Sequence, residues 1–568
     1  MPFPIIVWSL KDNADQIGYE LLNRLDHVLR GLTNIVTNTS IEPYHVKKDL
    51  FIACGKTGGL DYDFKYENNV IEYGVRFPSA FSKDSMILRI KVDTSVHINI
   101  PKTPYYSTHL YVWRKHGIVV LSPWNIPVLL SAALFEGFNI NPAYIVGQII
   151  QGYPIENDEI HPSVRKLSLG SNITITPGLN IETKEYTDYD KLLPPDTDKL
   201  VSLLLNGGKA FLSWASEKGA NKIRIGLSGG LDSRTVSAVL AKANEELRLV
   251  DVEAFTTRSP TTDPDEVKIA KEVADILGLK HEIVYHNPSE ENLDKMLSGM
   301  LGVLQTNSIS NNIALANGTG GDKTLAPLGR LRWKEPKTLL EAASLAISRY
   351  DYSRYSKDFY SVLESWRKDL IYKLLQFKEK TPLGLFRRYL VGSRMLNWLV
   401  AFQHPLITPF LYPPYFDYAL MIEPRAKNYY LLYSKVLAKI DRTLLSVPYY
   451  NLRCRFSLNP LLQKIKLNIC FLLTAARKVV KGQRGSLVPA RQAYIPLEKT
   501  YHRLGDQLDK YWEFSGFSKN SNIVGVITNE AENIIKLKIL DARALVVLYN
   551  ILKCLSKLLL LLKACEKA

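Results

Sequence analysis

The sequence predicts an α/β protein built from three regions, and three patterns along the chain indicate this. Residues 1 to about 185 contain short segments rich in Val, Ile, Tyr and Thr, bounded by Pro, Gly or Asn, which is typical of β-strands. From Asp198 to Ala316, strand and helix patterns alternate, which indicates a parallel sheet with helices on both faces. From about residue 336 onward, apolar residues mostly follow helical spacing.

In the first region, we expect strands in Ser85–Asp93, Leu110–Leu121 and Ser171–Thr176 and a helix in Gln16–Leu32. The polar stretch Tyr186–Thr197 follows, and its two consecutive prolines resist regular structure. A chain of 568 residues also exceeds what one hydrophobic core usually organises. We therefore expect domains at residues 1–190, 197–460 and 461–568.

In the second region, segments with the apolar spacing of a helix alternate with segments with the pattern of a strand. The expected elements are a helix in Asp198–Lys218, a strand in Asn221–Leu227, a helix in Thr235–Glu246, a strand in Val252–Phe255, a helix in Asp265–Leu277, and strands in His281–Val284 and Ile313–Ala316. In an open parallel sheet, ligands bind at the carboxyl ends of the strands. The loops after these strands are therefore the first places to look for a site.

The composition is that of a folded protein with a basic surface. Hydrophobic residues make up 46% of the chain, which excludes a disordered protein. The formal net charge is +16, from 72 Lys+Arg against 56 Asp+Glu, and it suits a polyanionic partner or simply a solvated basic surface. The five cysteines contain no Cys-x-x-Cys pair, so we expect neither a zinc site nor a disulfide framework, and a reducing compartment fits better.

Two further features of the sequence bear on where the protein is located. The first residues lack a basic segment followed by a long apolar stretch, so no signal peptide is expected. No stretch of about 18 uncharged apolar residues occurs, so no membrane-spanning helix is expected. We expect a cytoplasmic protein.

The segment Ser228-Gly229-Gly230-Leu231-Asp232-Ser233 carries the most information and is called the first loop. The two glycines let the backbone approach a bulky anion, and free N–H groups at the following helix start point at phosphate oxygens. Asp232 would repel bare phosphate, so its presence implies a cation, most simply Mg²⁺. The alternative, an ordinary strand–turn–helix connection with a serine cap, explains the whole string less well. Gly55-Lys56-Thr57 lacks the leading glycine of a Walker A loop and is interpreted as a turn.

A second glycine-rich segment, Asn317-Gly318-Thr319-Gly320-Gly321-Asp322, follows the expected strand Ile313–Ala316 and is called the second loop. Parallel strands would bring both loops to one crevice, with Asp232 and Asp322 placed to hold metal around a pyrophosphate group. A glycine-rich turn with a solvent-exposed Asp is the alternative.

At these residues the chain resembles the asparagine synthetase superfamily of ATP pyrophosphatases. The first loop resembles the family's pyrophosphate loop, the second loop resembles Gly-x-Gly-Ser/Gly-Asp-Glu, and Pro409-Phe410-Leu411 resembles Pro-Phe-Leu-Asp with Tyr412 in place of Asp. The resemblance covers roughly residues 85–460. It implies a degenerate glutaminase-like sandwich of the Ntn-hydrolase type, then a synthetase domain of the adenine-nucleotide α-hydrolase type, then a helical extension packed on that domain.

The resemblance also implies a reaction and a set of site residues. Members adenylate a carboxylate with ATP, release pyrophosphate and let an amine attack the acyl-AMP. Asp232 and Asp322 would hold Mg²⁺, and the backbone near Leu227 and Thr256 would contact adenine. The implied ATP and pyrophosphate ligands are Leu227, Ser228, Gly229, Gly230, Leu231, Asp232, Ser233, Thr256, Gly318, Gly320 and Gly321.

Three departures from the family pattern affect the chemistry. Glutamine-dependent members carry Cys after Met1, whereas this chain has Pro2, which offers no nucleophilic side chain. Thr319 stands where an acidic residue or tyrosine often helps to deprotonate the amine, and Lys323 replaces the Glu after the Asp. Arg453 can be aligned with the family's catalytic lysine, and a solvated loop residue is the alternative.

The third region is basic and apolar. Leu461–Arg484 interleaves Lys and Arg with apolar residues, which is typical of a helix that lies on an acidic membrane surface or packs on the protein with its lysine stems buried. Leu548–Lys563 predicts a similar terminal helix.

These observations favour an ATP-dependent ligase that joins a small-molecule or peptide carboxylate to an amine, without glutaminase activity. Its catalytic residues would be Asp232, Asp322 and Arg453. The alternative is a noncatalytic nucleotide-binding or interaction protein whose acceptor site has decayed, which Thr319 and Lys323 favour. A nucleic-acid partner is not expected, because the chain lacks the paired cysteines of sulfur-transferring relatives and a recognisable RNA-binding motif.

Overall fold

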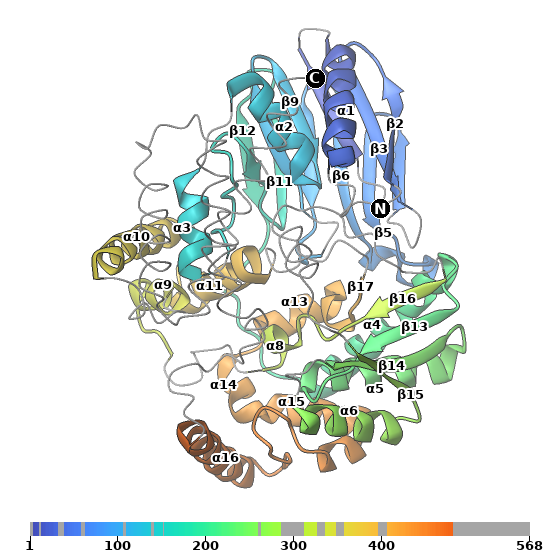
Figure 1. The fold of residues 1–568 in the computed structure, drawn as a ribbon, viewed down its shortest axis with the longest axis vertical. Coiled ribbons are helices and arrows are strands. Elements are labelled where there is room, and N and C mark those ends of the chain that lie inside the picture. The colour runs from blue at the N-terminus through green and yellow to red at the C-terminus, as the bar shows by residue number, and fades with distance from the viewer. Residues whose placement is uncertain are drawn as a thin grey trace.

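A computed structural model describes the fold of the chain. It describes residues 4–10, 13–31, 39–57, 63–105, 109–137, 141–151, 153–258, 263–285, 312–326, 335–347, 357–395 and 406–480. Figure 1 shows two sheets in the N-terminal part of the chain and a third sheet beyond them, with the later helices around the third sheet and beside the first two. The expected helix in Leu548–Lys563 lies outside the described residues.

The N-terminal part of the described chain forms two six-stranded antiparallel sheets. In order, the first contains β10 (Arg165–Lys166), β8 (Tyr111–Lys115), β9 (Ile118–Ser122), β1 (Pro4–Ser9), β3 (Leu50–Thr57) and β2 (Thr39–Val46). The second contains β12 (Ile181–Glu185), β11 (Ser171–Ile175), β7 (Val96–Ile100), β6 (Met86–Val92), β5 (Val70–Val75) and β4 (Asp63–Glu67).

Burial along the strands shows that these sheets form a sandwich. Every residue of β1 and of β9 is buried, because α1 (Ala14–Gly31) and α2 (Asn125–Glu136) cover one face of the first sheet and the second sheet covers the other (Figure 1). In β7 and β11 of the second sheet, buried residues alternate with less buried ones, as expected for a sheet with one solvated face.

The third sheet has five strands, and all of its pairings are parallel. Its order is β15 (Lys280–Tyr285), β14 (Asp251–Arg258), β13 (Lys222–Gly226), β16 (Ile313–Ala316) and β17 (Leu406–Ile407). The helices connected with these strands are α4 (Thr197–Glu217), α5 (Leu231–Leu247) and α6 (Pro264–Ile276). The sheet centre, β13, is the strand that leads into the first loop.

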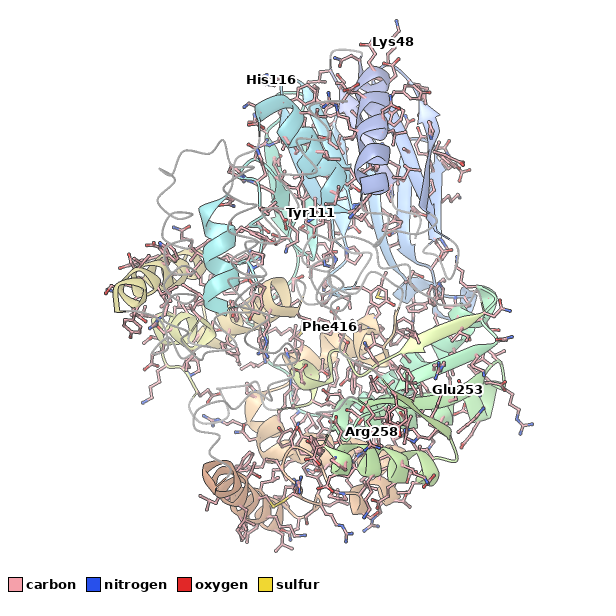
Figure 2. All side chains as sticks on the ribbon, viewed as in Figure 1. Lys48, Tyr111, His116, Glu253, Arg258 and Phe416 are labelled. Carbon is pink, nitrogen blue, oxygen red and sulfur yellow. A yellow bond between two sulfur atoms is a disulfide. The ribbon has the colours of Figure 1, made fainter. Side chains whose placement is uncertain are left out.

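The α-helices of the described residues that begin in or after the second loop lie around the third sheet and beside the sandwich. They are α8 (Gly321–Thr324), α9 (Leu339–Ile347), α10 (Lys357–Leu375), α11 (Pro382–Arg388), α13 (Pro413–Met421), α14 (Pro424–Lys427), α15 (Leu431–Ile440) and α16 (Pro460–Val480). Helices α9, α10 and α11 lie beside α3 (Pro142–Gln151), whereas α13, with the buried Phe416, lies between the sandwich and the third sheet (Figures 1 and 2).

A buried ion-pair network joins the sandwich to these helices. The Arg388 guanidinium at the end of α11 lies 3.0 Å from Glu156, 2.8 Å from Glu185 and 3.3 Å from Glu379. Removing one partner from such a buried network leaves an uncompensated charge, which typically costs about 3–5 kcal/mol. The network therefore holds together two parts of the chain that the sequence suggested were separate domains, and the domain limits stay a prediction.

The structure confirms the predicted α/β fold class and its order. All of the named strands and helices of the first two regions occur within a few residues of their expected bounds. One expectation was too coarse, because Leu110–Leu121 is a hairpin rather than one strand. His116 and Gly117 form its turn with φ values of 56° and 84°, and a left-handed pair of this kind reverses a strand.

Candidate functional site

The loops after β13, β14, β16 and β17 all leave the same edge of the third sheet, because the four strands run parallel. This edge carries the first loop, the second loop and Pro409–Leu411, a short 3₁₀ helix. The topology thus places together three segments that are separated by up to about 180 residues in the sequence.

The first loop is ordered by its two serines. The Ser228 backbone N–H donates to Ser233 Oγ at 3.0 Å, and the two hydroxyl oxygens lie 3.1 Å apart. The Gly230 N–H donates to Ser228 Oγ at 3.2 Å, and Leu231 begins α5. Helix α5 has 17 residues, so the free N–H groups of its first turn carry the positive end of a full helix dipole.

The second loop packs directly on the start of α5. A Cβ atom at Gly318 would lie 2.6 Å from Asp232 Cβ, and one at Gly321 would lie 2.6 Å from Asp232 Oδ1 and 2.7 Å from Phe410 Cε2. Real Cβ atoms do not approach that closely, so only glycine fits at these two positions. Gly320 has φ 96° and is the N-cap of α8. The structure therefore brings both loops and Pro409–Leu411 into one site.

Asp232 occupies the contact between the loops. Its Oδ1 accepts a hydrogen bond from the hydroxyl of Tyr433 on α15 at 2.8 Å. Burial raises the pKa of Asp232 to about 6, although the Tyr433 hydrogen bond and the Lys323 charge act in the opposite direction. A raised pKa means that the surroundings disfavour the ionised form, so a bound cation would relieve an existing electrostatic cost.

Asp322 is in a different setting. Its side chain is 52% exposed and forms an ion pair with Lys323, whose side chain is 11% exposed. The pair lies in the single turn of α8 and involves consecutive residues. The carboxylate that the sequence assigned to metal binding is therefore neutralised by its own neighbour.

Mg²⁺ fits this pair of loops through the chemistry of their donors. Mg²⁺ is usually bound by one or two carboxylates together with substrate phosphates and water, rather than by a complete protein cage. Asp232 and Asp322 are two such carboxylates, one on each of two loops in contact. Within the described ranges, no group of three or more His, Cys, Asp or Glu side chains is placed to hold a metal ion by itself, so the remaining ligands would come from phosphate and water.

The expected adenine-contacting backbone is already hydrogen-bonded. The Leu227 N–H donates to Phe255 O at 2.8 Å, and the Thr256 hydroxyl donates to Leu227 O at 2.7 Å. Thr256 Oγ1 also lies 2.8 Å from His281 Nε2. The Thr256 side chain thus joins the residue after β13 to β14 and to the start of β15, and the Leu227 carbonyl keeps one lone pair for a ligand.

Tyr450 brings a further segment to the first loop. The Tyr450 N–H donates to Gly229 O at 3.2 Å, and a Cβ at Gly229 would lie 2.6 Å from Tyr450 Cβ. Arg453 belongs to the same turn, has φ 51°, and donates its backbone N–H to Tyr450 O at 3.3 Å. The predicted catalytic Arg453 therefore lies on a turn that contacts the first loop.

The guanidinium of Arg453 points to acidic residues at the start of α6. It lies 2.9 Å from Asp263 Oδ2 and 2.7 Å from Asp265 Oδ2, and the side chain is 42% exposed. Asp263 also accepts from the hydroxyl of Tyr450 at 3.2 Å. Arg453 is thus an ion-paired residue beside the loop, which differs from the freely solvated alternative.

Two important residues were missed by sequence reasoning. One is Tyr433, described above. The other is Arg234, which is fully buried and donates to Leu444 O, Val447 O and Pro448 O at 3.2, 2.8 and 2.9 Å. Burial lowers the pKa of Arg234 to about 10, and its three carbonyl partners hold the segment that leads to Tyr450. A charged residue next to the first loop was a visible signal for Arg234, whereas Tyr433 gave none.

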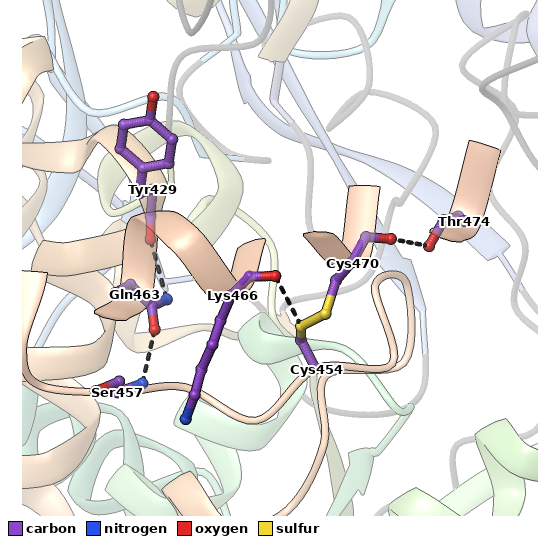
Figure 3. The surroundings of a disulfide bond; sticks show 7 residues. All are labelled: Tyr429, Cys454, Ser457, Gln463, Lys466, Cys470 and Thr474. Carbon is purple, nitrogen blue, oxygen red and sulfur yellow. Dashed lines mark hydrogen bonds between the residues drawn. A yellow bond between two sulfur atoms is a disulfide. The ribbon is translucent and has the colours of Figure 1, made fainter. Parts of the chain in front are cut away.

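No disulfide framework was expected, yet the described part of the chain contains one disulfide. Cys454 and Cys470 are bonded across a separation of 16 residues and link the Arg453 turn to α16 (Figure 3). The spacing is not diagnostic in sequence, because it depends on the helix returning past the turn. Cys54 is buried and takes no part in this disulfide. No helix in the described ranges is both long enough and apolar enough to span a membrane.

Comparison with known proteins supplies one match. No curated protein matches the chain. The family model for asparagine synthase matches residues 220–308, which include β13, the first loop, β14, α6 and β15. At the level of the family, this match indicates an ATP-dependent ligase that forms amides. Residues 220–308 thus match an asparagine synthase domain, and this match, with both glycine loops at one sheet edge, supports membership of the asparagine synthetase superfamily.

Proposed function

We propose that the protein activates a carboxylate with ATP as an acyl-adenylate, releases pyrophosphate and transfers the acyl group to an amine. The observation that carries this proposal is the contact between the loops, where Gly318 and Gly321 pack on Asp232 at the start of α5. A helix start with free N–H groups, next to two carboxylates, is a setting for metal-bound polyphosphate.

In the proposed first step, a carboxylate oxygen attacks the α-phosphorus of ATP. The new C–O–P bond forms as the bond from the α-phosphorus to the bridging oxygen breaks, and pyrophosphate leaves. The N–H groups of Gly229 and of Leu231 to Ser233 would hold the departing pyrophosphate, whereas the Gly230 N–H donates to Ser228 Oγ. Asp232 and Asp322 would hold Mg²⁺, which stabilises negative charge on the phosphate oxygens when bound.

In the second step, an amine nitrogen attacks the acyl carbon, AMP leaves and the nitrogen loses a proton. Thr319 stands at the expected base position, and its hydroxyl is buried without a hydrogen-bond partner among the described residues. A threonine hydroxyl is too weak a base at neutral pH. We therefore propose that the amine arrives in its neutral form, and that the Thr319 hydroxyl serves to bind a substrate group.

Arg453 is proposed to stabilise charge at the α-phosphate. Its guanidinium is always charged and has several N–H donors, but it has no proton to give. Asp263 and Asp265 hold it beside the first loop in the ligand-free protein. Phosphate oxygens would compete with these carboxylates for the guanidinium.

The N-terminal sandwich is proposed to be a degenerate glutaminase-like domain without glutaminase activity. The residue after Met1 is Pro2, and the first cysteine in the chain is Cys54. Cys54 is buried on β3 opposite Pro4 of β1, and a buried thiol ionises less readily than an exposed one. The amine would then come from solution or from a second molecule. We propose a cytoplasmic location because ATP is available there, and the Cys454–Cys470 disulfide removes the lack of disulfides as a reason for it.

A second candidate function is noncatalytic nucleotide binding. The Lys323–Asp322 ion pair favours it, because a lysine bound to Asp322 competes with a metal for the same carboxylate. Such a protein would bind ATP at the first loop without releasing pyrophosphate.

The test is pyrophosphate release from Mg²⁺-ATP with a panel of amino acids, other carboxylates and peptides, with and without ammonia or an added amine. The ligase requires release that depends on one carboxylate. ATP binding by calorimetry without any release would establish the noncatalytic function instead. Glutamate release from glutamine, measured in parallel on the parent and on Cys54→Ala, tests the sandwich. Release above background in the parent would contradict the absence of glutaminase activity.

A further inference from the structure

Helix α16 packs on the protein by one face only. Gln463 and Leu467 are fully buried, and the side chain of Gln463 donates to Tyr429 O at 3.1 Å and accepts from the Ser457 N–H at 2.6 Å (Figure 3). The Cys454–Cys470 disulfide adds a covalent attachment on the same side. These contacts fix which face of α16 is turned outward.

The outward face of α16 carries large apolar side chains. At about 100° per residue, six of them fall within an arc of roughly 120° opposite Gln463 and Leu467. They are Leu461 (67% exposed), Leu462 (49%), Ile465 (47%), Ile469 (51%), Leu472 (71%) and Leu473 (51%), and they are called the apolar stripe. A contiguous apolar surface of this kind on a protein surface marks an interaction site.

The charged residues of α16 itself are all basic. Lys464 and Lys466 are exposed and flank it on its two sides. The sequence contains no Asp or Glu between Asp441 and Glu498. A partner for this surface must therefore tolerate, or be attracted by, the positive charge of this helix, which no acidic residue of the helix itself neutralises.

We propose that the apolar stripe of α16 docks the protein on an anionic lipid surface, with the helix lying in the plane of the membrane. An interfacial helix needs an apolar face about the width of this stripe and basic residues at its borders, and α16 has both. Figure 1 shows α16 at the edge of the molecule, at the far end from the sandwich, where a flat surface can reach it.

A segment of the same chain or a second copy of α16 could also cover the apolar stripe, but the charge of each disfavours it. The apolar segment Leu548–Lys563 of the same chain carries Lys553, Lys557 and Lys563 and no acidic residue, so it would bring positive charge to a positive border. A second copy of α16 would do the same. An anionic lipid headgroup supplies the opposite charge, and each lysine near such a surface adds attraction that salt weakens.

The experiment is co-sedimentation of the full chain with vesicles of phosphatidylcholine, alone and with about one third phosphatidylserine, at low and high salt. We expect binding to the phosphatidylserine vesicles that falls with salt. Leu472→Asp should lower the partition coefficient at least about tenfold, because it places a charge in the apolar face. The matched control is Leu340→Asp, which changes a 57% exposed leucine on α9 and should bind like the parent.

Lys464→Gln combined with Lys466→Gln should weaken binding to the phosphatidylserine vesicles by about tenfold or more and leave binding to phosphatidylcholine unchanged. Thermal unfolding of each variant serves as the check of folding. No binding at low salt, or equal binding by Leu472→Asp and the parent, would overturn the proposal. Self-association without vesicles that Leu472→Asp abolishes would assign the stripe to a second copy instead, and would also overturn it.

Discussion

The two glycine loops lie against each other but are built for different tasks. The first loop is closed by hydrogen bonds between Ser228, Gly230 and Ser233, and Tyr450 packs on its backbone. The second loop packs closely on the first because Gly318 and Gly321 have no side chains. Its polar residues, however, differ from those of the family pattern. Its carboxylate is paired with Lys323, and its Thr319 hydroxyl has no partner in the described part of the chain.

This difference separates two halves of the proposed reaction. Adenylation and pyrophosphate departure depend on the first loop and on Asp232, and the packing there is intact. In the proposed reaction, Asp322 of the second loop also serves adenylation, whereas amine attack depends on Thr319 and its neighbours, and Thr319 is an altered residue. The comparison therefore predicts that nucleotide chemistry survives in this protein while the acceptor differs from that of a glutamine- or ammonia-dependent asparagine synthetase.

The largest expected effect comes from Asp232→Asn. The substitution keeps the shape and an oxygen that can accept from Tyr433, but it removes the charge that would hold Mg²⁺. We expect pyrophosphate release to fall about 10²–10³-fold. Asp198→Asn is the control, because Asp198 is 81% exposed in a surface ion pair with Lys439 and should leave release unchanged. Equal release by Asp232→Asn and the parent would mean that the first loop is not the phosphate site.

A smaller effect is expected from Gly229→Ala. The new methyl group would meet Tyr450 Cβ at 2.6 Å, so the loop or the Arg453 turn must shift. A displacement of about 1 Å near a reacting group can cost about 10²-fold in rate, and we expect a loss of about 10–100-fold in pyrophosphate release. Gly226→Ala, whose nearest neighbours lie at 3.8 Å, is the matched control in the preceding strand. Similar losses in both variants would show that the Tyr450 contact is not what positions the loop.

Lys323→Gln tests the second loop. Unlike the two preceding variants, which should lower pyrophosphate release, it should make the protein more sensitive to Mg²⁺. Without the lysine, the carboxylate of Asp322 is free for a cation, and the Mg²⁺ concentration that gives half-maximal pyrophosphate release should fall several-fold. Lys439→Gln breaks an exposed ion pair of the same kind and is the control. A loss of release in Lys323→Gln would instead make the lysine part of the catalytic site.

The smallest expected effect concerns stability in the metal-free protein. The pKa of Asp232 is raised to about 6 from the ordinary 3.8, so the folded state holds this proton more tightly than the unfolded state does. Its ionisation therefore lowers the free energy of unfolding as pH rises from about 4 through 6. With a chelator present, Asp232→Asn should be about 1–2 kcal/mol more stable than the parent at pH 7.5. Urea unfolding at pH 7.5 and at pH 4 measures this, and a difference that fails to shrink at pH 4 would contradict it.

Local features of the site were predictable from sequence, and long-range ones were not. The first loop was recognisable because a strand, two glycines and a helix start are consecutive in the chain. The meeting of the two loops followed from the alternation of strands and helices. Tyr433 reaches Asp232 from about 200 residues away, through the packing of α15 against α5, and no local pattern records that contact.

The same reason explains the remaining errors and omissions. The Cys454–Cys470 bond depends on how α16 returns past the Arg453 turn, which spacing alone does not show. The ion pairs of Arg453 with Asp263 and Asp265 join a turn to a helix start nearly 190 residues earlier. The residue types in the loops indicated the chemistry of the site. The ion-pair and hydrogen-bond partners of each charged residue were visible only in the structure.

The most direct test of the central claim is to identify the products of ATP and the fate of the carboxylate oxygen. The protein is incubated with Mg²⁺-ATP and an ¹⁸O-labelled carboxylate selected from the panel, with its amine, and the nucleotide is analysed by mass spectrometry. Adenylation predicts AMP and pyrophosphate as the products, with one ¹⁸O atom transferred from the carboxylate to the phosphate of AMP. Formation of ADP and phosphate, or AMP without the label, would contradict it.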